Sequence, residues 1–415
     1  MRALHRCVAC GADEFAARVW GRQPLLTRAA ELPRDYSDLL SPAMVDEIVA
    51  ERGVRTPFVR MAREGTLVDR ACFTRSAGFG AQIADQLDPD GVLTQYAAGA
   101  TLVLQGLHRF WPPIIDFVRG MTSDVGHPVQ TNAYITPPAN RGFDPHYDVH
   151  DVFVLQVSGT KRWRVHEPVH HHPLPDQPWT DHREAIAERA KDAPVIDTVL
   201  EPGDCLYLPR GWVHSAEAQG DTSIHLTVGV APLTGHEVAT AMIEALASEE
   251  ELRASLPFGL APVDAARAEP HAREVLDVLA RLIAEKQEQL SALAGDALDE
   301  KYLDLTRPAA IRPLATLDAV ASLDADTRLH LREGLHARVD CTDSDADSDS
   351  AAANPGAVVL RLPTKSVTFP AVCAPALRAV LEGDPVSAGT LPGLNADDGL
   401  VVLRRLLREG VVVAL

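Results

Sequence analysis

The sequence has few cysteines and no long apolar run. It contains 6 cysteines in 415 residues, and it lacks the run of about 18 uncharged apolar residues that a membrane-spanning helix requires. The opening residues MRALHRCVACGADEF lack the apolar core of a secretory signal. Cys7 and Cys10 form one CxxC pair, but the second pair that a zinc ribbon needs is missing. These absences predict a cytoplasmic protein with reduced thiols and no membrane association.

Positive charge is also scarce. Lys and Arg number 39 against 58 Asp and Glu, which gives a formal net charge of -19 at pH 7. General nucleic-acid binding depends on neutralising phosphates with Lys and Arg, so direct binding of nucleic acid is not expected. An acidic chain instead attracts basic partners.

The length predicts two or three domains, and the first two regions differ in pattern. Residues 1–90 are typical of mixed helix and loop, with a helix start predicted where Ser41 precedes Pro42. Residues 91–232 consist of short β-branched and aromatic runs separated by turns, which predict a β-sandwich or barrel on which the N-terminal region packs. The strand runs are VLTQYAAG, QTNAYITPP, HDVFVLQVSG, KRWRVHEP, DTVLEPGDCLYLPRGWVHSA and TSIHLTVGV.

After Pro232 the pattern changes to helix. Residues 233–306 carry apolar positions at helical spacing, which indicate either core packing or a seam between two copies, and we expect a homodimer. Residues 307–415 form another small unit, whose helices and closing apolar strand are what a winged helix looks like. An acidic stretch near 341–356 predicts a flexible loop within it. The helical stripe consists of Val275, Leu276, Leu279, Leu282 and Ile283.

The most informative run is GFDPHYDVHDVFVLQVSGTKRW, in which His146 and Asp148 are two residues apart. Residues i and i+2 of a strand project to the same face, so both side chains can reach one ion. His214, which closes GDCLYLPRGWVH, is the natural third ligand. Two histidines and one carboxylate form the facial triad of nonhaem Fe(II) oxygenases, which leaves positions for a bidentate 2-oxo acid and for O2. The three residues therefore predict an iron site.

Other histidines offer alternatives. His150 would point to the same face as the HxD pair but lies farther along the strand, and His225 lies in SIHLTVG with its own alternation. We interpret both as supporting or core histidines. The run 170–172 lies in the Pro-rich stretch HEPVHHHPLPDQP and indicates a solvated loop.

Two runs carry a family resemblance. NAYITPPANRGFDPHYDVHDVFVLQVSGTKRW resembles the catalytic barrel of the JmjC-type ribosomal oxygenases, the cupin-4 group, and GDCLYLPRGWVHSAEA resembles the strand that bears their final histidine. The resemblance covers about residues 90–232 strongly and the remainder more loosely. It implies an α+β fold: a double-stranded β-helix (JmjC/cupin jelly-roll) barrel at 91–232, a helical dimerisation region at 233–306 and a winged-helix-like domain at 307–415.

The resemblance also implies the cofactors and the site. Fe(II) would be held by His146, Asp148 and His214, with 2-oxoglutarate and O2 as cosubstrates. Lys161 would bind the distal carboxylate of 2-oxoglutarate; a buried ammonium is indeed costly without an anion. The alternative for Lys161 is a surface lysine in a row with other basic residues. The residues that resemble the remaining lining of the pocket are Asn132, Tyr134 and Thr227.

The implied activity is hydroxylation of an amino-acid side chain, Arg or His, of a ribosomal protein. Bacterial arginine-hydroxylating members tend to carry Arg where this chain has Lys161, and Lys is more like the histidine-hydroxylating eukaryotic members. The acidic surface suits a basic target. Two alternatives stay open: the same chemistry on a biosynthetic peptide or small molecule, and a noncatalytic cupin used for binding. A degenerate cupin usually lacks a ligand, whereas all three candidates are present here.

Overall fold

The structure is a computed structural model that describes residues 3–63, 65–138, 144–258, 260, 265–341 and 356–414. The chain divides into two compact units, Met1–Pro232 and Leu233–Leu415. Within the described ranges, every helix is too short or too polar to cross a membrane. The acidic stretch near 341–356, predicted to be a flexible loop, lies outside the described residues apart from its two ends.

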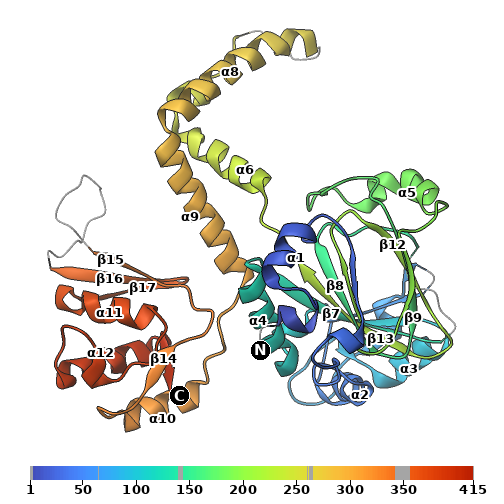
Figure 1. Ribbon diagram of the computed structural model, residues 1–415, viewed down its shortest axis with the longest axis horizontal. Helices are drawn as coiled ribbons and strands as arrows, with labels where there is room; N and C mark the ends of the chain where they lie inside the picture. The colour runs from blue at the N-terminus through green and yellow to red at the C-terminus, as the bar shows by residue number, and fades with distance from the viewer. Residues whose placement is uncertain are drawn as a thin grey trace. The chain divides into compact units, whose positions relative to one another are not determined.

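Two antiparallel sheets form the barrel of the first unit (Figure 1). The large sheet has 8 strands in the order β1-β11-β8-β13-β7-β6-β2-β3, and a 3-stranded sheet has the order β10-β9-β12. The large sheet contains β1 (Leu25–Thr27), β2 (Val59–Arg63), β3 (Thr66–Leu67), β6 (Thr101–Leu104), β7 (Val129–Thr136), β8 (Asp151–Ser158), β11 (Cys205–Leu208) and β13 (Ser223–Val230). The small sheet contains β9 (Lys161–His166), β10 (Ile196–Leu200) and β12 (Val213–Ala218), and a separate pair is made by β4 (Thr74–Arg75) and β5 (Gln86–Leu87).

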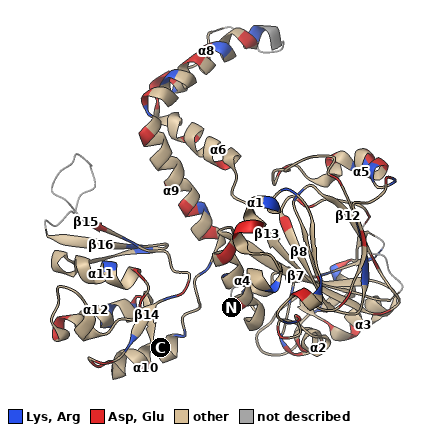
Figure 2. Cartoon of the chain, in the orientation of Figure 1, with Lys and Arg blue, Asp and Glu red and all other residues tan. Residues whose placement is uncertain are grey.

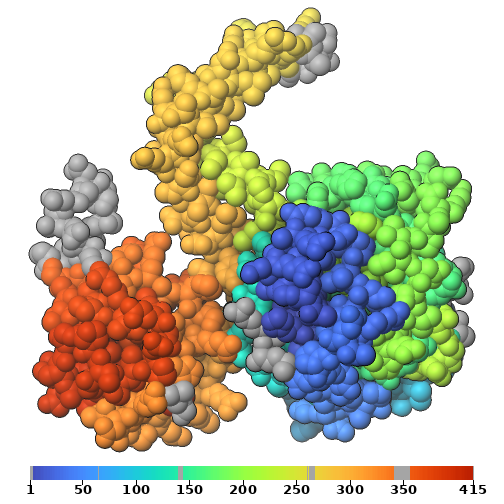
Figure 3. Space-filling view, viewed as in Figure 1, coloured from blue at the N-terminus to red at the C-terminus, as the bar shows by residue number. Residues whose placement is uncertain are grey.

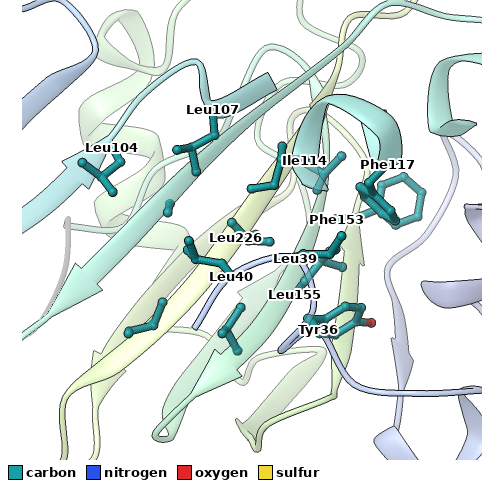
Figure 4. Packing of buried hydrophobic residues seen from close by; sticks show 14 of the residues in the cluster. Tyr36, Leu39, Leu40, Leu104, Leu107, Ile114, Phe117, Phe153, Leu155 and Leu226 are labelled. Atoms are coloured by element: carbon teal, nitrogen blue, oxygen red, sulfur yellow. The ribbon is translucent and has the colours of Figure 1, made fainter. Parts of the chain in front are cut away.

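Successive side chains of strand β8 point to opposite faces of the large sheet and contribute to two hydrophobic cores. Phe153 and Leu155 pack on one face of the large sheet against helices of the N-terminal half. Val152 and Val154 point to the other face, where they pack with Trp163 of the small sheet. Figure 4 shows part of the first core, whose labelled members are Tyr36, Leu39, Leu40, Leu104, Leu107, Ile114, Phe117, Phe153, Leu155 and Leu226.

The N-terminal region both covers and extends the large sheet. Its residues, blue in Figure 3, lie over one side of the first unit. The predicted helix start is confirmed, because the Ser41 hydroxyl accepts a hydrogen bond from the Met44 amide at 3.3 Å. Beyond the predicted helix and loop, the structure adds β1, β2 and β3 to the sheet. The helices are α1 (Ala12–Arg18), α2 (Pro42–Glu51), α3 (Pro89–Ala97), α4 (Pro112–Val125) and α5 (Arg183–Arg189).

One predicted strand was wrong. Most of the run VLTQYAAG, residues 92–97, belongs to helix α3, which begins at Pro89 directly after Asp88. A proline at the first helical position has its φ angle preset for a helix and loses no needed hydrogen bond there. This start signal outweighs the strand preference of the β-branched and aromatic residues in the run.

The second unit combines helices with small sheets, as the sequence predicts in outline. Helices α6 (Gly235–Ala245), α7 (Glu250–Arg253), α8 (Ala265–Glu285) and α9 (Gln287–Leu305) form its first part. In its C-terminal part β14 pairs with β18, and β15, β16 and β17 form a three-stranded sheet. The bounds here are α10 (Pro313–Ser322), β14 (Leu329–Leu331), β15 (Arg338–Cys341), β16 (Ala357–Leu362), β17 (Lys365–Pro370), α11 (Ala374–Leu381), α12 (Ala396–Arg408) and β18 (Val412–Ala414).

Candidate metal centre

Three side chains converge between the two sheets. Donor atoms of His146, Asp148 and His214 all lie within 4.8 Å of one another. The two imidazole centroids are 4.5 Å apart, and Nε2 of His214 is 3.8 Å from Oδ2 of Asp148. The structure therefore brings together the three residues that the sequence predicts as metal ligands. The predicted strand for His146 and Asp148 is wrong, because both lie in the loop before β8 and His146 forms only an isolated bridge there.

The backbone joins the two segments that carry these side chains. His146 and His214 form an antiparallel bridge, with N–H···O distances of 3.1 and 2.8 Å. The amide of Gly211, in the turn before His214, donates to the carbonyl of Asp148 at 3.0 Å. Asp151 holds the same turn, because its carboxylate accepts from the Arg210 amide at 2.7 Å. These bonds fix the spacing of the ligands independently of any ion.

Both histidines are oriented by main-chain carbonyls. Nδ1 of His146 lies 2.7 Å from the carbonyl of Asp144, and Nδ1 of His214 lies 3.0 Å from the carbonyl of Trp212. A carbonyl only accepts, so each Nδ1 carries the proton and each Nε2 keeps its lone pair. This tautomer is the one that suits a metal ligand, and it is held before any metal binds.

The charge state of the centre also suits a cation. Burial lowers the pKa of His214 to about 4, and the charge that His146 can carry acts in the same direction. Burial alone would raise the pKa of Asp148, but neighbouring histidines outweigh it and hold that pKa below its ordinary value. Near neutral pH, His214 is neutral and Asp148 is a carboxylate, as metal ligation requires. Two imidazoles, one carboxylate and no thiolate fit Fe(II).

Lys161 lies in the same pocket as the triad. It is 3% exposed, and its ammonium donates to the Thr136 hydroxyl at 3.1 Å. Burial lowers the pKa of Lys161 to about 7. No carboxylate pairs with it among the residues that the structure describes. The alternative of a surface lysine is therefore wrong, and the pocket offers a buried cation without an anion.

Of the three remaining candidates for the pocket lining, two line the pocket and one does not. Tyr134 and Thr227 line the pocket, on neighbouring strands β7 and β13. Asn132 shares the strand face of Tyr134 but is not part of the pocket wall, and its side-chain oxygen accepts from the Gly106 amide at 2.9 Å. The structure thus gives Asn132 a structural bond to a loop.

The rival histidines lie outside the triad. The ring of His150 lies against Gly229 of β13, where any added side chain would collide with it. His225, interpreted as a supporting or core histidine, lines the pocket. His171 and His172 are exposed, and His170 stacks on His182 at 4.9 Å; none of the three joins a metal-ligand group in the described ranges.

Sequence reasoning missed two contributors. Thr136, which bonds Lys161, lies two residues beyond Tyr134 on β7, so strand alternation could have found it. Arg60 of β2 donates a hydrogen bond to the Tyr134 side chain and adds positive charge near Asp148. No local motif marks Arg60, which reaches the site through the pairing of β2 with β6 and of β6 with β7.

A facial triad and a buried lysine inside a two-sheet barrel define the class of JmjC-type 2-oxoglutarate oxygenase domains. Residues 109–238 match the family described as JmjC domain. The chain is a JmjC-domain protein related to the ribosomal oxygenases, and the resemblance stated from the sequence is confirmed.

The similar proteins share part of the chain with it. Ribosomal oxygenase 1 of Bos taurus is 33% identical over 217 residues, which cover 52% of this chain and 31% of that protein. The bifunctional lysine-specific demethylase and histidyl-hydroxylase NO66 of Culex quinquefasciatus is 27% identical over 264 residues, or 60% of this chain and 38% of that protein. The chain thus spans about a third of the length of these curated relatives.

Solved structures resemble this chain in fold over nearly its whole length. The Escherichia coli ribosomal oxygenase YcfD matches with a TM-score of 0.54 at 16% identity, covering 98% of both chains. The structure of YcfD in complex with cobalt and 2-oxoglutarate matches with a TM-score of 0.51 at 16% identity, again covering 98% of both chains. At this identity the likeness speaks for the fold alone.

Proposed function

We propose that the chain is an Fe(II)- and 2-oxoglutarate-dependent oxygenase that hydroxylates an Arg or His side chain of a ribosomal protein. One observation carries the proposal: the triad of His146, Asp148 and His214 shares a single pocket with the buried, anion-free Lys161. A metal triad alone fits many reactions. A buried cation in the same pocket favours an acidic cosubstrate, because an unpaired buried charge costs free energy.

The chain's own residues do the binding and orienting. His146, Asp148 and His214 would hold the metal on one face, and Lys161 would neutralise the distal carboxylate of 2-oxoglutarate while Thr136 keeps its ammonium in place. Apolar walls from Val152, Val154 and Leu208 exclude water from the reacting centre. The bound iron and cosubstrate supply the O2-dependent oxidative chemistry that ends in hydroxylation of a C–H bond.

A basic protein is the substrate that charge favours. The formal net charge of -19 attracts cationic surfaces, and both Ribosomal oxygenase 1 and YcfD are named as ribosomal oxygenases. We expect peptides from one ribosomal protein to gain the mass of one oxygen when incubated with the protein, Fe(II), 2-oxoglutarate and O2. Mass spectrometry of ribosomal proteins from cells with and without the gene identifies the modified residue.

The same experiment separates the alternatives. Succinate release without any modified ribosomal peptide would favour a biosynthetic peptide or a small molecule as substrate. No succinate from the metal-loaded protein with any candidate would favour a noncatalytic binding module. The intact triad supports the enzyme.

We also propose that the helical region joins two copies of the chain. The apolar stripe of helix α8 is only partly buried. Leu279 and Leu282 pack inside the second unit, whereas Leu276 and Ile283 are 63% and 41% exposed. Helix α8 carries charged residues of both signs (Figure 2), and Arg273, Asp277, Arg281 and Glu285 lie close to this row in the sequence. An exposed apolar row bordered by charges is typical of a seam between helices.

Substituting Leu276→Asp together with Ile283→Asp is expected to convert the dimer into a monomer. Size-exclusion chromatography with light scattering measures the mass directly. Asp277→Lys, on the same helix but at an exposed polar position, is the matched control and leaves the mass unchanged. A dimer that survives the double substitution would place the contact elsewhere.

The C-terminal region is proposed as a winged-helix-like interaction module. Helices α11 and α12 are followed by β18, the order of helix, helix and strand that the sequence predicts. Residues 310–415 hold 10 Lys and Arg against 14 Asp and Glu, so a protein partner fits this module better than DNA.

A further inference from the structure

His225 is a buried histidine that none of the assigned roles uses. It lies in the middle of β13 and is 3% exposed. Its Nδ1 is buried and has no hydrogen-bond partner among the residues that the structure describes. Buried polar groups are nearly always hydrogen-bonded, because leaving one unpaired costs free energy. The unpaired Nδ1 of His225 therefore calls for a partner that the described residues do not provide.

Two aromatic rings fix the orientation of His225. Its imidazole stacks parallel to the Tyr134 ring, with centroids 5.0 Å apart and an interplanar angle of 1°. The Trp163 ring meets it edge-on at 5.6 Å and 85°. A ring held on two sides has lost most of its freedom before any ligand arrives, so a hydrogen bond from it costs little further ordering.

The surroundings of His225 point to an anion. The ring lines the same pocket as Lys161, and the charge of Lys161 acts on it directly. Burial, with a further contribution from Lys161, holds the pKa of His225 well below its ordinary value. The imidazole is therefore neutral at pH 7 and offers one N–H donor beside the ammonium. A donor next to an unpaired cation is the arrangement that binds a carboxylate.

We propose that His225 donates a hydrogen bond to the distal carboxylate of the 2-oxo acid cosubstrate, and that with Lys161 it selects a dicarboxylate over a monocarboxylate. This inference rests on the proposed function, because it assumes that a 2-oxo acid occupies the pocket. It gives β13 a specificity-determining residue in addition to His214 of β12 and to His146 and Asp148 of the loop before β8.

The test measures binding rather than turnover. Calorimetric titration of the full-length, Mn(II)-loaded protein with 2-oxoglutarate gives the dissociation constant. His225→Phe keeps a ring for Tyr134 but removes both nitrogens, and we expect it to weaken 2-oxoglutarate binding by about tenfold or more. Binding of pyruvate, which lacks the distal carboxylate, is expected to be equal in both proteins. His225→Gln, which restores a donor, is expected to recover part of the affinity.

A matched control and a stability measurement distinguish this role from a structural one. His166 is also buried, at 4% exposed, with an unpaired Nδ1, but it does not line the pocket. His166→Phe is expected to bind 2-oxoglutarate as the unsubstituted protein does. His225→Phe is expected to raise the unfolding temperature of the ligand-free protein, because an unpaired buried polar group is removed.

The possible failures differ in what they contradict. Unchanged 2-oxoglutarate affinity in His225→Phe, or an equal loss of pyruvate binding, would overturn the proposal for His225 and leave the proposed function intact. A Mn(II)-loaded, unsubstituted protein that binds no 2-oxoglutarate would instead contradict the proposed function, and the inference with it.

Discussion

Replacing His146 with Ala is expected to abolish stoichiometric Fe(II) binding and to lower succinate formation by more than about a hundredfold. Loss of a residue that merely supports a metal ligand already costs about 10- to 100-fold in affinity or activity, and His146 would itself be a ligand. The two remaining donors, Asp148 and His214, cannot define a face of the coordination sphere. Metal analysis of the purified protein and succinate release at fixed 2-oxoglutarate measure the two effects.

His171→Ala is the matched control for this experiment. His171 is exposed and belongs to the histidine-rich loop, so its loss removes an imidazole without touching the triad. We expect metal content and turnover to be unchanged in this variant. Full metal content and turnover in His146→Ala would show that the metal assignment is wrong, whereas equal losses in both variants would point to the loop.

The HxD spacing explains why the triad could be predicted from the sequence, although His146 and Asp148 lie in the loop before β8 and not on a strand. His146 and Asp148 belong to one short segment, and His214 closes a run whose turn carries a glycine at φ 88°. That glycine, Gly211, is needed because an added Cβ would lie 2.5 Å from the carbonyl oxygen of His170. Both patterns are local in the sequence, so they can be recognised without knowledge of the sheet order.

Contacts that depend on sheet order could not be predicted in the same way. Arg60 reaches Tyr134 because β6 lies between β2 and β7, and nothing in the sequence near Arg60 encodes that neighbour. The pocket role predicted for Asn132 failed for the opposite reason. Its strand face is as predicted, but its side chain accepts a hydrogen bond from the Gly106 amide in a neighbouring loop. Alternation fixes the face of a residue, whereas the partner on that face is set by distant parts of the chain.

The helical stripe on α8 was ambiguous for a related reason. Five apolar residues cover more surface than a single helical neighbour can bury, and the sequence left core packing and a seam between copies open. The structure assigns Leu279 and Leu282 to the inner side and leaves Leu276 exposed. Periodicity identifies the apolar face of a helix but not the partner that covers it.

Replacing Lys161 with Met is expected to weaken 2-oxoglutarate binding by at least about thirtyfold and to stabilise the ligand-free protein at pH 7. A thirtyfold loss corresponds to about 2 kcal/mol, the lower end of what removal of one partner of a buried charge pair costs. Lys161 is 3% exposed, and within the described ranges the Thr136 hydroxyl is the one hydrogen-bond partner of its ammonium. Met has a similar length, no charge and the flexibility to fill the same space.

The stability effect has a definite pH dependence. The pKa of Lys161 is about 7 in the folded protein and 10.5 as the ordinary value of the side chain. Between these two values the unfolded chain holds one more proton than the folded chain, so stability rises with pH across this window. Below pH 7 both states are protonated and the full cost of the buried charge is present. Lys161→Met lacks this rise, and its advantage over the unsubstituted protein shrinks toward pH 10.5.

Thermal unfolding across this pH range, with and without 2-oxoglutarate, measures both the stability of the ligand-free protein and its stabilisation by the bound cosubstrate. Lys191→Met is the matched control, because the Lys191 side chain is 70% exposed and its ammonium pairs with Glu188 on the surface. The unfolding curve of this variant should follow that of the unsubstituted protein. A Lys161→Met protein that is less stable at pH 7, or that binds 2-oxoglutarate normally, would contradict the cosubstrate role.

A bound dicarboxylate should reverse the sign of the lysine's contribution. The carboxylate favours the ammonium form, so saturating 2-oxoglutarate is expected to raise the pKa of Lys161 and to flatten the rise in stability between pH 7 and 10.5. Pyruvate, which brings no second carboxylate to the lysine, should leave the rise in place. A residue that destabilises the free protein and stabilises only its complex with a dicarboxylate is retained for binding, since packing alone would favour Met at this position.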